Sequence, residues 1–353
     1  MDIGFWKGRS VFITGHTGFK GGWLSLWLVS LGARVTGYSL APPTTPSLFE
    51  VAGIAEDLHS GIGDIRDQQQ LHAAIAQARA EIVIHLAAQP LVRESYVQPV
   101  LTYATNVMGT VNVLEAVRAT PSVRSVLVIT SDKCYANRPT DGGYAESDPM
   151  GGDDPYSSSK GCAELVAAAY RESYFSAAGV GLATARAGNV IGGGDWARDR
   201  IVPDAIAAFV RGESLEIRYP GATRPWQHVL DPVAGYLMLC ERLMSAANVY
   251  SSGWNFGPDL ADAQSVAAFA SRIAEHWGDG AQWHPVPGEH PKETQHLQLN
   301  CDKAKAQLGW QPTWLLERGL EETVRWYRAW SDKADMRLFT REQIQCYQQE
   351  HLR

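Results

Sequence analysis

The residue pair with the clearest chemical potential is Tyr156 and Lys160, which lie four positions apart at the start of a predicted helix over residues 156–178. This spacing puts both side chains on one helix face, where a lysine ammonium favours the phenolate and lowers the pKa of the tyrosine. Such a pair makes a general base for a sugar or alcohol hydroxyl. It follows a predicted strand that ends in Thr130-Ser131-Asp132-Lys133, so that Ser131 can orient the same hydroxyl. By itself, Tyr-x-x-x-Lys also fits an ordinary pair on a surface helix.

A glycine-rich turn lies near the start of the chain. The apolar run Ser10-Val11-Phe12-Ile13 is followed by glycines at positions 15, 18 and 21 and by an apolar stretch long enough for a helix. A strand, a glycine turn and a helix direct backbone N–H groups and the positive helix end at a phosphate, which a Cβ would keep away. Although many of the 33 glycines must stand in plain turns, a second predicted strand over 33–39 completes a βαβ unit. The turn therefore favours dinucleotide binding.

Predicted strands and helices alternate through the first half of the sequence. Near-continuous apolar runs, such as Glu-Ile-Val-Ile-His-Leu-Ala-Ala over residues 81–88, are typical of strands buried on both faces of a parallel sheet. We therefore predict an α/β fold with a doubly wound parallel sheet. The predicted strands are 10–14, 33–39, 57–62, 81–88, 123–131 and 180–187, and the helices between them are 22–31, 67–79, 99–119 and 156–178.

The pattern loosens after about residue 188, where tryptophan and proline become more frequent. We interpret residues 1–188 as a dinucleotide-binding domain, to which residues 229–252 return. Residues 189–228 and 253–335 are expected to form a smaller α/β substrate-binding domain over the carboxyl ends of the strands, where such folds bind ligands. The polar C-terminal tail, 336–353, fits either a helix or a frayed end.

Composition argues against several classes of function. The formal net charge is −7 and no lysine- or arginine-rich run exists, so the chain is not expected to bind nucleic acid. Because the sequence enters a predicted strand almost at once, we expect no signal peptide, and no apolar run reaches the length of a membrane span. The five cysteines are scattered without a Cys-x-x-Cys pair, which predicts reduced thiols in the cytoplasm and no metal site.

Six motifs occur in the chain in a recognisable order. They are Thr14-Gly15-x-x-Gly18-x-x-Gly21, His85-Leu86-Ala87-Ala88, Asn106-Val107-x-Gly109-Thr110, Tyr156-x-x-x-Lys160, Arg186-x-Gly188-Asn189-Val190 and Arg224-x-Trp226-x-x-Val229-x-Asp231. Together they resemble the extended short-chain dehydrogenases/reductases that act on nucleotide sugars. The resemblance covers about residues 8–330 and implies a Rossmann-type sheet with a smaller substrate-binding domain.

The resemblance also implies an NAD cofactor. The acid that usually holds the ribose of NAD after the second strand is missing, because Tyr38, Ser39, Leu40 and Ala41 stand there. No arginine that would bind the 2′-phosphate of NADP stands there either, so NAD is favoured over NADP. Asp64 either borders the adenine or caps a turn. The implied cofactor residues are Gly15, Thr17, Gly18, Phe19, Lys20, Gly21, Tyr38, Asp64, Ile65, Leu86, Ala87, Ala88, Asn106, Thr130, Tyr156 and Lys160.

Residues 131–133 favour one subclass, the sugar 4,6-dehydratases, whose members carry Asp directly after the Ser or Thr, usually followed by Glu. Asp132 resembles the acid that protonates the leaving O6 hydroxyl, although an Asp here also fits a helix or turn cap. Lys133 departs from the usual Glu and either takes the C5 proton, which needs a depressed pKa, or stabilises the enolate as a cation. The implied catalytic residues are Ser131, Asp132, Lys133, Tyr156 and Lys160.

The implied reaction is redox-neutral, because C4 is oxidised, water leaves across C5 and C6, and the hydride returns to C6. Two other functions fit the same fold. An epimerase needs no acid at O6, and a non-catalytic dinucleotide sensor would lose the Tyr/Lys pair. The sequence therefore favours a 4,6-dehydratase over both.

The substrate that the resemblance implies is a CDP-linked sugar, and dTDP-glucose and GDP-mannose stay as alternatives, because the choice of base rests on the overall resemblance alone. Asn189 resembles the family residue that holds a substrate phosphate or sugar oxygen. Arg224 matches a diphosphate ligand, and Arg200 either joins it or is only a charge at a helix start. Gln89 and Arg93 follow the strand over 81–88 and fit either a sugar contact or a helix-start loop.

The family also pairs two helices with their copies in a four-helix dimer interface. The helices predicted over 99–119 and 156–178 correspond to them, and both carry apolar residues on more than one side. We therefore expect a homodimer through these helices. The alternative is that both helices pack only on the sheet.

Overall fold

Seven parallel strands form the central sheet of the computed structural model, which describes residues 1–138, 142–259, 262–287 and 298–352. Their order is β11-β6-β5-β4-β1-β2-β3, and every pairing is parallel. The predicted doubly wound α/β fold is confirmed. The strands are β1 Ser10–Thr14, β2 Arg34–Ser39, β3 His59–Ile62, β4 Ile82–His85, β5 Ser125–Ile129, β6 Gly181–Arg186 and β11 Gly253–Asn255.

Side chains of the central strands alternate between two buried apolar layers. In β1, Val11 and Ile13 lie in the larger cluster, whereas Phe12 lies in the smaller cluster on the other face. In β5, Leu127 belongs to the larger cluster and Val126 to the smaller one. A strand covered on both faces needs apolar residues at successive positions, which is why these strands stand out in the sequence as continuous runs.

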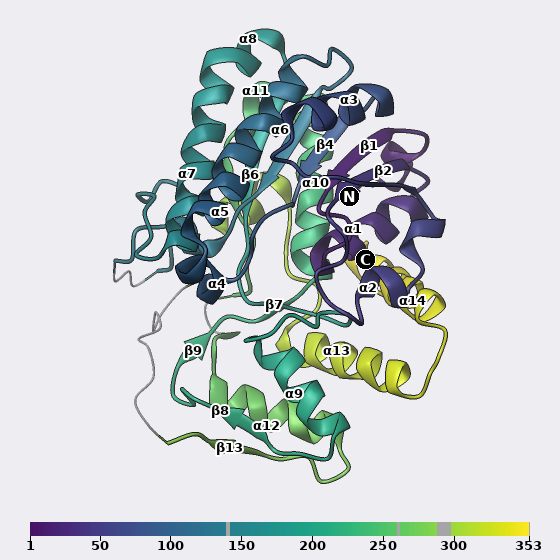
Figure 1. Cartoon of the computed structure of the whole chain (residues 1–353), viewed down its shortest axis with the longest axis vertical. Helices are drawn as coiled ribbons and strands as arrows, with labels where there is room; N and C mark the ends of the chain where they lie inside the picture. The colour runs from purple at the N-terminus through teal and green to yellow at the C-terminus, as the bar shows by residue number, and fades with distance from the viewer. Residues whose placement is uncertain (139–141, 260–261, 288–297, 353) are drawn as a thin grey trace.

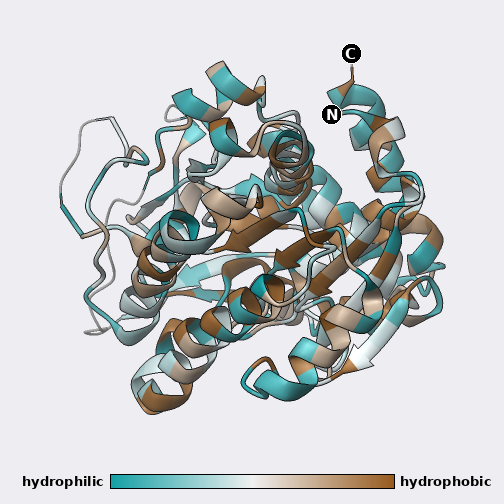
Figure 2. Cartoon of the chain, turned by 90° about the horizontal axis from the view of Figure 1, so that it is seen from above, coloured by the Kyte–Doolittle hydropathy of each residue, from teal (hydrophilic) through white to brown (hydrophobic). Residues whose placement is uncertain are grey.

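Helices cover both faces of the sheet, as the view from above shows (Figure 2). On one face lie α1 Phe19–Ser30 and α10 Leu230–Ser245. On the other lie α3 Gln68–Ala78, α6 Gly109–Arg118 and α7 Pro155–Tyr170. The shorter helices of this part are α2 Leu48–Val51, α4 Val92–Val97, α5 Pro99–Tyr103, α8 Ser176–Ala178 and α11 Ala247–Tyr250.

The two long predicted helices are each interrupted by one π-helical segment. Ala104–Met108 joins α5 to α6 within the predicted range 99–119, and Arg171–Phe175 joins α7 to α8 within 156–178. The first range is helical as far as Arg118 and the second over its whole length, but the hydrogen-bonding pattern changes where the π-helical segment intervenes.

The order of the strands reverses at β1, because the chain goes on to β2 and β3 on one side and then crosses to β4 on the other. In open parallel sheets, ligands bind outside the carboxyl ends of the strands at such a point. The glycine turn after β1, the residues after β4 and β5, and the start of α7 all meet there. The topology thus brings segments from distant parts of the sequence to one edge.

A smaller part of the chain lies beyond this edge, in the lower half of Figure 1. It contains α9 Ile201–Val210, α12 Val266–Trp277 and α13 Leu316–Ser331. Its strand pairs are β7 Val190–Ile191 with β10 Gln227–His228, β9 Thr223–Arg224 with β12 Gln264–Ser265, and β8 Leu215–Ile217 with β13 Trp283–Pro285. The division into domains stays a prediction, but one boundary differs, since β11 joins the central sheet although we assigned residues from 253 onwards to the smaller domain.

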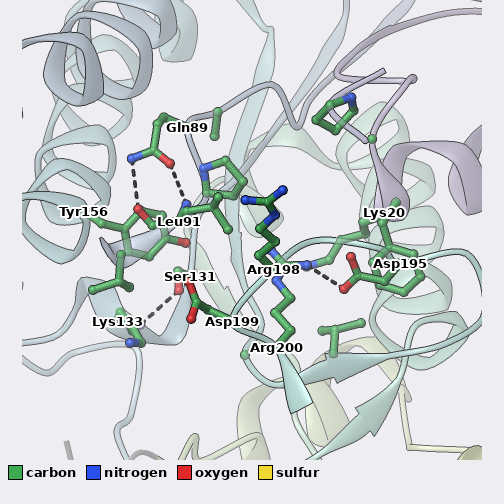
Figure 3. Close-up of a pocket in the computed structure, with 18 of the residues that line it drawn as sticks. Lys20, Gln89, Leu91, Ser131, Lys133, Tyr156, Asp195, Arg198, Asp199 and Arg200 are labelled. Carbon is green, nitrogen blue, oxygen red and sulfur yellow. Dashed lines mark hydrogen bonds and ion pairs between the residues drawn. The ribbon is translucent and has the colours of Figure 1, made fainter. Parts of the chain in front are cut away.

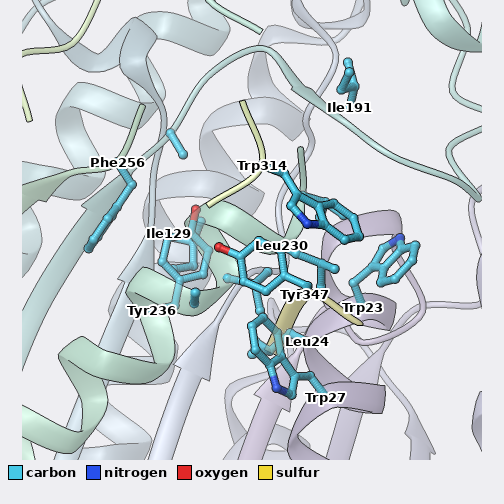
Figure 4. Close-up of a cluster of buried hydrophobic side chains, with 14 of the residues drawn as sticks. Trp23, Leu24, Trp27, Ile129, Ile191, Leu230, Tyr236, Phe256, Trp314 and Tyr347 are labelled. Carbon is cyan, nitrogen blue, oxygen red and sulfur yellow. The ribbon is translucent and has the colours of Figure 1, made fainter. Parts of the chain in front are cut away.

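The C-terminal tail is a helix, α14 Met336–His351, and it is packed rather than frayed. Met336, Ile344 and Tyr347 are buried, at a spacing that puts them on one helix face. Tyr347 meets the indoles of Trp27 and Trp314 edge to face, with ring centroids 5.4 and 5.2 Å apart (Figure 4). The tail therefore helps to cover α1 and the larger apolar cluster.

The five cysteines are all free thiols in the structure. Within the described parts of the chain, we find no helix that combines the length and the apolar character needed to cross a membrane.

Candidate active site

A cavity of about 1000 Å³ opens at the carboxyl ends of β1, β4 and β5 and extends to α9 and β8 of the smaller part. Figure 3 shows the side chains that point into it. All the predicted catalytic and substrate-binding residues line this cavity, and so do all the predicted cofactor residues except Tyr38 and Asn106. The sequence-predicted residues thus lie in one continuous space.

The glycine turn owes its shape to close backbone contacts. Gly15 has φ +84°, and a Cβ there would lie 2.7 Å from the backbone nitrogen of Ala87. A Cβ on Gly21 would lie 2.1 Å from the carbonyl oxygen of Gly15, so these two glycines are needed for the turn itself. Gly18 differs, because it lines the cavity at the start of α1 and no side chain caps that helix. The first amides of α1 are therefore left for a ligand.

Tyr156 stands at the start of α7, whose first turn is ordered by Pro155 and by the Asp154 carboxylate, which accepts a hydrogen bond from the Ser157 amide at 2.9 Å. Burial raises the pKa of the phenol to about 12, while the Ser131 hydroxyl and the charge of Arg200 lower it. The predicted lowering of the Tyr156 pKa below its ordinary value is therefore wrong for the protein alone. The physical reason is that the loss of hydration destabilises the buried phenolate more than the neighbouring groups stabilise it.

Lys160 lies one turn further along α7 and is 6% exposed. Its ammonium donates a hydrogen bond to the carbonyl oxygen of Ile129 at 3.2 Å, at the end of β5. Burial lowers the pKa of Lys160 to about 8, and the nearby carboxylate of Glu164 opposes this shift. The pair Tyr156 and Lys160 is thus a buried pair at the cavity and not a pair on a surface helix.

Asp132 is 4% exposed, and burial raises the pKa of its carboxyl. Ser131 donates from its hydroxyl to Oδ1 of Asp132 at 2.9 Å, and Nδ2 of Asn189 approaches Oδ2 at 3.5 Å. The short helical turn Asp132–Cys134 is capped by Ser131, whose hydroxyl accepts from the Lys133 amide at 3.2 Å. Ser131 therefore takes the capping role that the sequence left open for Asp132, whose carboxyl stands at the cavity.

Tyr38 lies behind the cavity rather than at it. Its ring packs on Phe12 in the smaller apolar cluster, with centroids 6.2 Å apart, and its hydroxyl donates to the carbonyl oxygen of Asp64. The neighbouring residues Ser39 and Leu40 line the cavity instead. Since successive side chains of a strand point to opposite faces, the strand position alone could not say which one faces the ligand.

Asn106 also lies behind the cavity, buried on the π-helical segment before α6. Its Oδ1 accepts from the Gln89 amide at 2.8 Å, and its Nδ2 donates to the Gln89 carbonyl at 3.1 Å and to Ser159 at 2.9 Å. Asn106 therefore fixes the loop that carries Gln89 to the cavity. Asp64 lines the cavity and forms an ion pair with Arg66 at 2.5 Å. Its Oδ1 also accepts a hydrogen bond from the Arg66 amide at 2.8 Å, as a turn cap does, while the contact with adenine stays a prediction.

Ion pairs hold the arginines of the substrate end. Arg200 pairs with Asp195 at 2.8 Å, and Arg93 of α4 pairs with Asp199 at 2.7 Å. Arg218 approaches Asp199 at 3.6 Å from the other side. Sequence analysis missed Asp195, Asp199, Arg198 and Arg218, which all line the cavity. They fall outside the family motifs, in the part of the sequence after residue 188 where the pattern of predicted elements loosens.

Lys20 reaches from the glycine turn into the middle of the site. Its ammonium lies 3.4 Å from the hydroxyl of Tyr236, and burial lowers the pKa of Lys20 to about 8. The charges of Arg200 and Lys160 lower it further, whereas Asp132 raises it. The site thus gathers several cations, which suits an anionic ligand.

The fold and this site define a Rossmann-type protein with a cavity suited to an anionic ligand, and comparison with known proteins shows its family. The family model described as GDP-mannose 4,6 dehydratase matches residues 12–323, and the chain belongs to this family. A CDP-glucose 4,6-dehydratase of Salmonella typhimurium is 51% identical over 352 residues, which cover 98% of each chain.

Solved structures share the fold. A dTDP-glucose 4,6-dehydratase of Streptomyces venezuelae with NAD bound is 23% identical with a TM-score of 0.77, covering 92% of this chain and 98% of that one. MoeE5 in complex with UDP-glucose and NAD is 26% identical with a TM-score of 0.74, covering 90% and 98%.

Proposed function

We propose that this protein is an NAD-dependent CDP-glucose 4,6-dehydratase, which converts CDP-glucose into CDP-4-keto-6-deoxyglucose and water. The observation that carries the proposal is the buried carboxyl of Asp132, whose pKa is raised, in the same cavity as Tyr156 and Lys160. A raised pKa increases the fraction of the carboxyl that carries a proton, which it can donate to a leaving hydroxyl. The relative that is 51% identical, itself a CDP-glucose 4,6-dehydratase, supports the choice of sugar nucleotide.

The glycine turn suits the pyrophosphate of NAD. A Cβ on Gly18 would have the Gly15 carbonyl at 3.4 Å as its nearest neighbour, so a side chain there would occupy cavity space rather than clash with the protein. The uncapped start of α1 offers amides to phosphate oxygens. Near the end of β3, Arg66 is paired with Asp64, which favours NAD over NADP. When bound there, NAD supplies a reversible hydride acceptor for C4 and donor for C6.

In the first step, Tyr156 accepts the proton of the O4 hydroxyl as C4 is oxidised. We assign the orientation of the same hydroxyl to Ser131, whose hydroxyl lowers the pKa of Tyr156 and donates to Asp132. Lys160 lines the same cavity and is fixed to the end of β5, and we assign to it the positive charge that favours the phenolate. These three groups make the alcohol more acidic at the moment when C4 loses its hydride.

In the second step, the 4-keto group makes the C5 proton acidic, and the O6 hydroxyl leaves as water. We assign the protonation of O6 to Asp132. Lys133 follows Asp132 in the sequence and also lines the cavity. We assign it the second role in the elimination, either as the base at C5 or as a cation beside the enolate. The diphosphate is assigned to Arg200 and Arg224, and the sugar to Gln89, Arg93 and Asn189, all of which line the cavity.

The homodimer is part of this proposal. A set of exposed apolar side chains, which we call the helical patch, supports it because its members lie on or beside the two long helices. The patch consists of Tyr96, Val97, Val100, Tyr103, Met108, Leu165 and Tyr174, which are 37–82% exposed. Two such patches would bury each other in an isologous interface. The cytoplasmic location stays a prediction from the sequence.

The test is to incubate the purified protein with CDP-glucose, dTDP-glucose and GDP-mannose separately and to follow the 4-keto product by its alkaline absorbance. We expect the wild-type protein to form product from CDP-glucose. The variant Asp132→Asn should still oxidise C4 but should not eliminate water, so that its 4-keto sugar keeps the O6 hydroxyl. No product from any of the three would overturn the dehydratase assignment. Unimpaired elimination by Asp132→Asn would overturn the role of that residue.

A further inference from the structure

We propose that the buried ion pair between Glu164 and Arg186 is a positioning device that holds the catalytic segment 130–135 in register with α7. This inference rests on the proposed dehydratase reaction. Neither residue lines the cavity, and both are about 95% buried, so they are not catalytic residues. Their role would be to act through the segment that carries Ser131, Asp132 and Lys133.

Glu164 makes the first connection. It lies one helical turn after Lys160 on α7, and its two carboxylate oxygens accept four hydrogen bonds. Two come from Arg186, at 2.9 and 2.8 Å, one from the Thr130 hydroxyl at 2.5 Å and one from the Thr184 hydroxyl at 2.6 Å. Thr130 immediately precedes Ser131, so this carboxylate joins the catalytic helix to the start of the catalytic segment.

Arg186 makes the second connection. Its Nη1 donates to the hydroxyl of Tyr135 at 2.5 Å, and its guanidinium lies 4.9 Å from the centre of that ring. The Tyr135 hydroxyl in turn donates to Oδ1 of Asn255 on β11 at 2.7 Å. Tyr135 follows the short turn Asp132–Cys134 directly. The same ion pair therefore grips the catalytic segment at its far end.

The two connections give the segment a defined position relative to the oxidation residues. Tyr156, Lys160 and Glu164 are spaced by four, so one face of α7 carries the proton acceptor, the cation and the anchor. The segment held by that anchor carries the acid of the elimination step. A buried pair with every polar atom satisfied is rigid, and a misplacement by about 1 Å is enough to slow a reaction by roughly a hundredfold.

Tyr135→Phe is the first variant to test, because it removes only the hydroxyl at the far end and keeps the ring stacked on Tyr144, with centroids 4.9 Å apart. Tyr144→Phe is the matched control, since the Tyr144 hydroxyl bonds to the backbone of Arg138 and not to the ion pair. Each variant is mixed with NAD and CDP-glucose in a single turnover, and mass spectrometry separates the oxidised sugar from the dehydrated sugar. Thermal melting is recorded in parallel.

We expect Tyr135→Phe to slow dehydration by about tenfold, while C4 oxidation changes less and oxidised sugar accumulates. Tyr144→Phe should lower the melting temperature about as much as Tyr135→Phe does, but it should dehydrate the sugar at the wild-type rate. The second pair is Thr130→Val against Thr184→Val, which remove one hydroxyl each from the same carboxylate, and only the first should shift the ratio of oxidised to dehydrated sugar.

Equal effects within both pairs, following the loss of melting temperature, would reduce the ion pair to a structural role and overturn the proposal. Failure of the wild-type protein to dehydrate CDP-glucose would instead overturn the proposed function. The two failures are therefore distinguishable.

Discussion

Gly188 lies against the carboxyl group of Asp132, so closely that a Cβ at position 188 would stand 1.8 Å from Oδ2 and 2.1 Å from Cγ. The glycine of the motif Arg186-x-Gly188-Asn189-Val190 therefore makes room for a catalytic side chain that comes from a different strand. Gly188 and Asp132 are 56 residues apart in the chain, so only the fold brings them into contact.

Gly188→Ala should keep the fold but displace the carboxyl of Asp132, because the clash falls on the end of a side chain that can rotate. Dehydration of CDP-glucose should fall by about a hundredfold, with C4 oxidation less affected. Single-turnover product analysis measures both steps. The control is Gly142→Ala, where a Cβ meets no atom within 4 Å. Equal dehydration by the two variants would contradict the role of this contact.

Arg200→Gln should move the pH dependence of C4 oxidation. The charge of Arg200 lowers the pKa of Tyr156, which burial raises, so its removal raises that pKa further. Because the phenol must lose its proton to act as a base, the acidic limb of kcat should move to higher pH. Arg211→Gln, at an exposed pair with Glu213, is the control that should leave the limb in place. If the acidic limb of the pH profile stays in place in both variants, the charge of Arg200 does not influence the pKa of Tyr156.

Asp231→Asn should change how stability depends on pH. Burial raises the pKa of Asp231 to about 7, against hydrogen bonds from the amides of Thr313 and Trp314 and from the hydroxyl of Tyr347. Between the unfolded pKa of about 4 and the folded pKa of about 7, the native state binds more protons, so this group makes stability fall as pH rises.

The melting temperature of the wild type should therefore decline relative to that of Asp231→Asn between pH 5 and pH 8. Taking the difference between the two proteins removes the contributions of the groups that they share. If the difference stays constant over this range, Asp231 does not titrate there.

Leu165→Glu should convert the proposed dimer into a monomer. Leu165 is 61% exposed within the helical patch, and a charge there would have to be buried in the interface. Val249→Glu is the control, because Val249 is 65% exposed on α11, outside the patch. Light scattering at micromolar concentration measures the mass. A wild-type protein that is already monomeric would contradict the interface.

Much of the fold could be predicted because burial leaves a direct trace in the sequence. Strands such as β1 and β5 are covered on both faces, so every position must be apolar or small, and their boundaries were found within a few residues. The strand β11 was not predicted, because three residues are too few to show a pattern and only the pairing with β6 defines them as a strand. The tail was ambiguous, since its polar residues hide the stripe formed by Met336, Ile344 and Tyr347.

The sequence by itself determined which groups are available for chemistry, because a glycine turn, a Tyr/Lys pair and a Ser-Asp-Lys strand end have recognisable spacing. Only the tertiary structure decided which side chains face the cavity and in what electrostatic state. In the fold, the side chain of Tyr38 packs in the core and Ser39 lines the cavity. Burial in the fold also raises the pKa values of Tyr156 and Asp132. Solvation and contact across distant segments are properties of the folded chain, and neither has a local signal in the sequence.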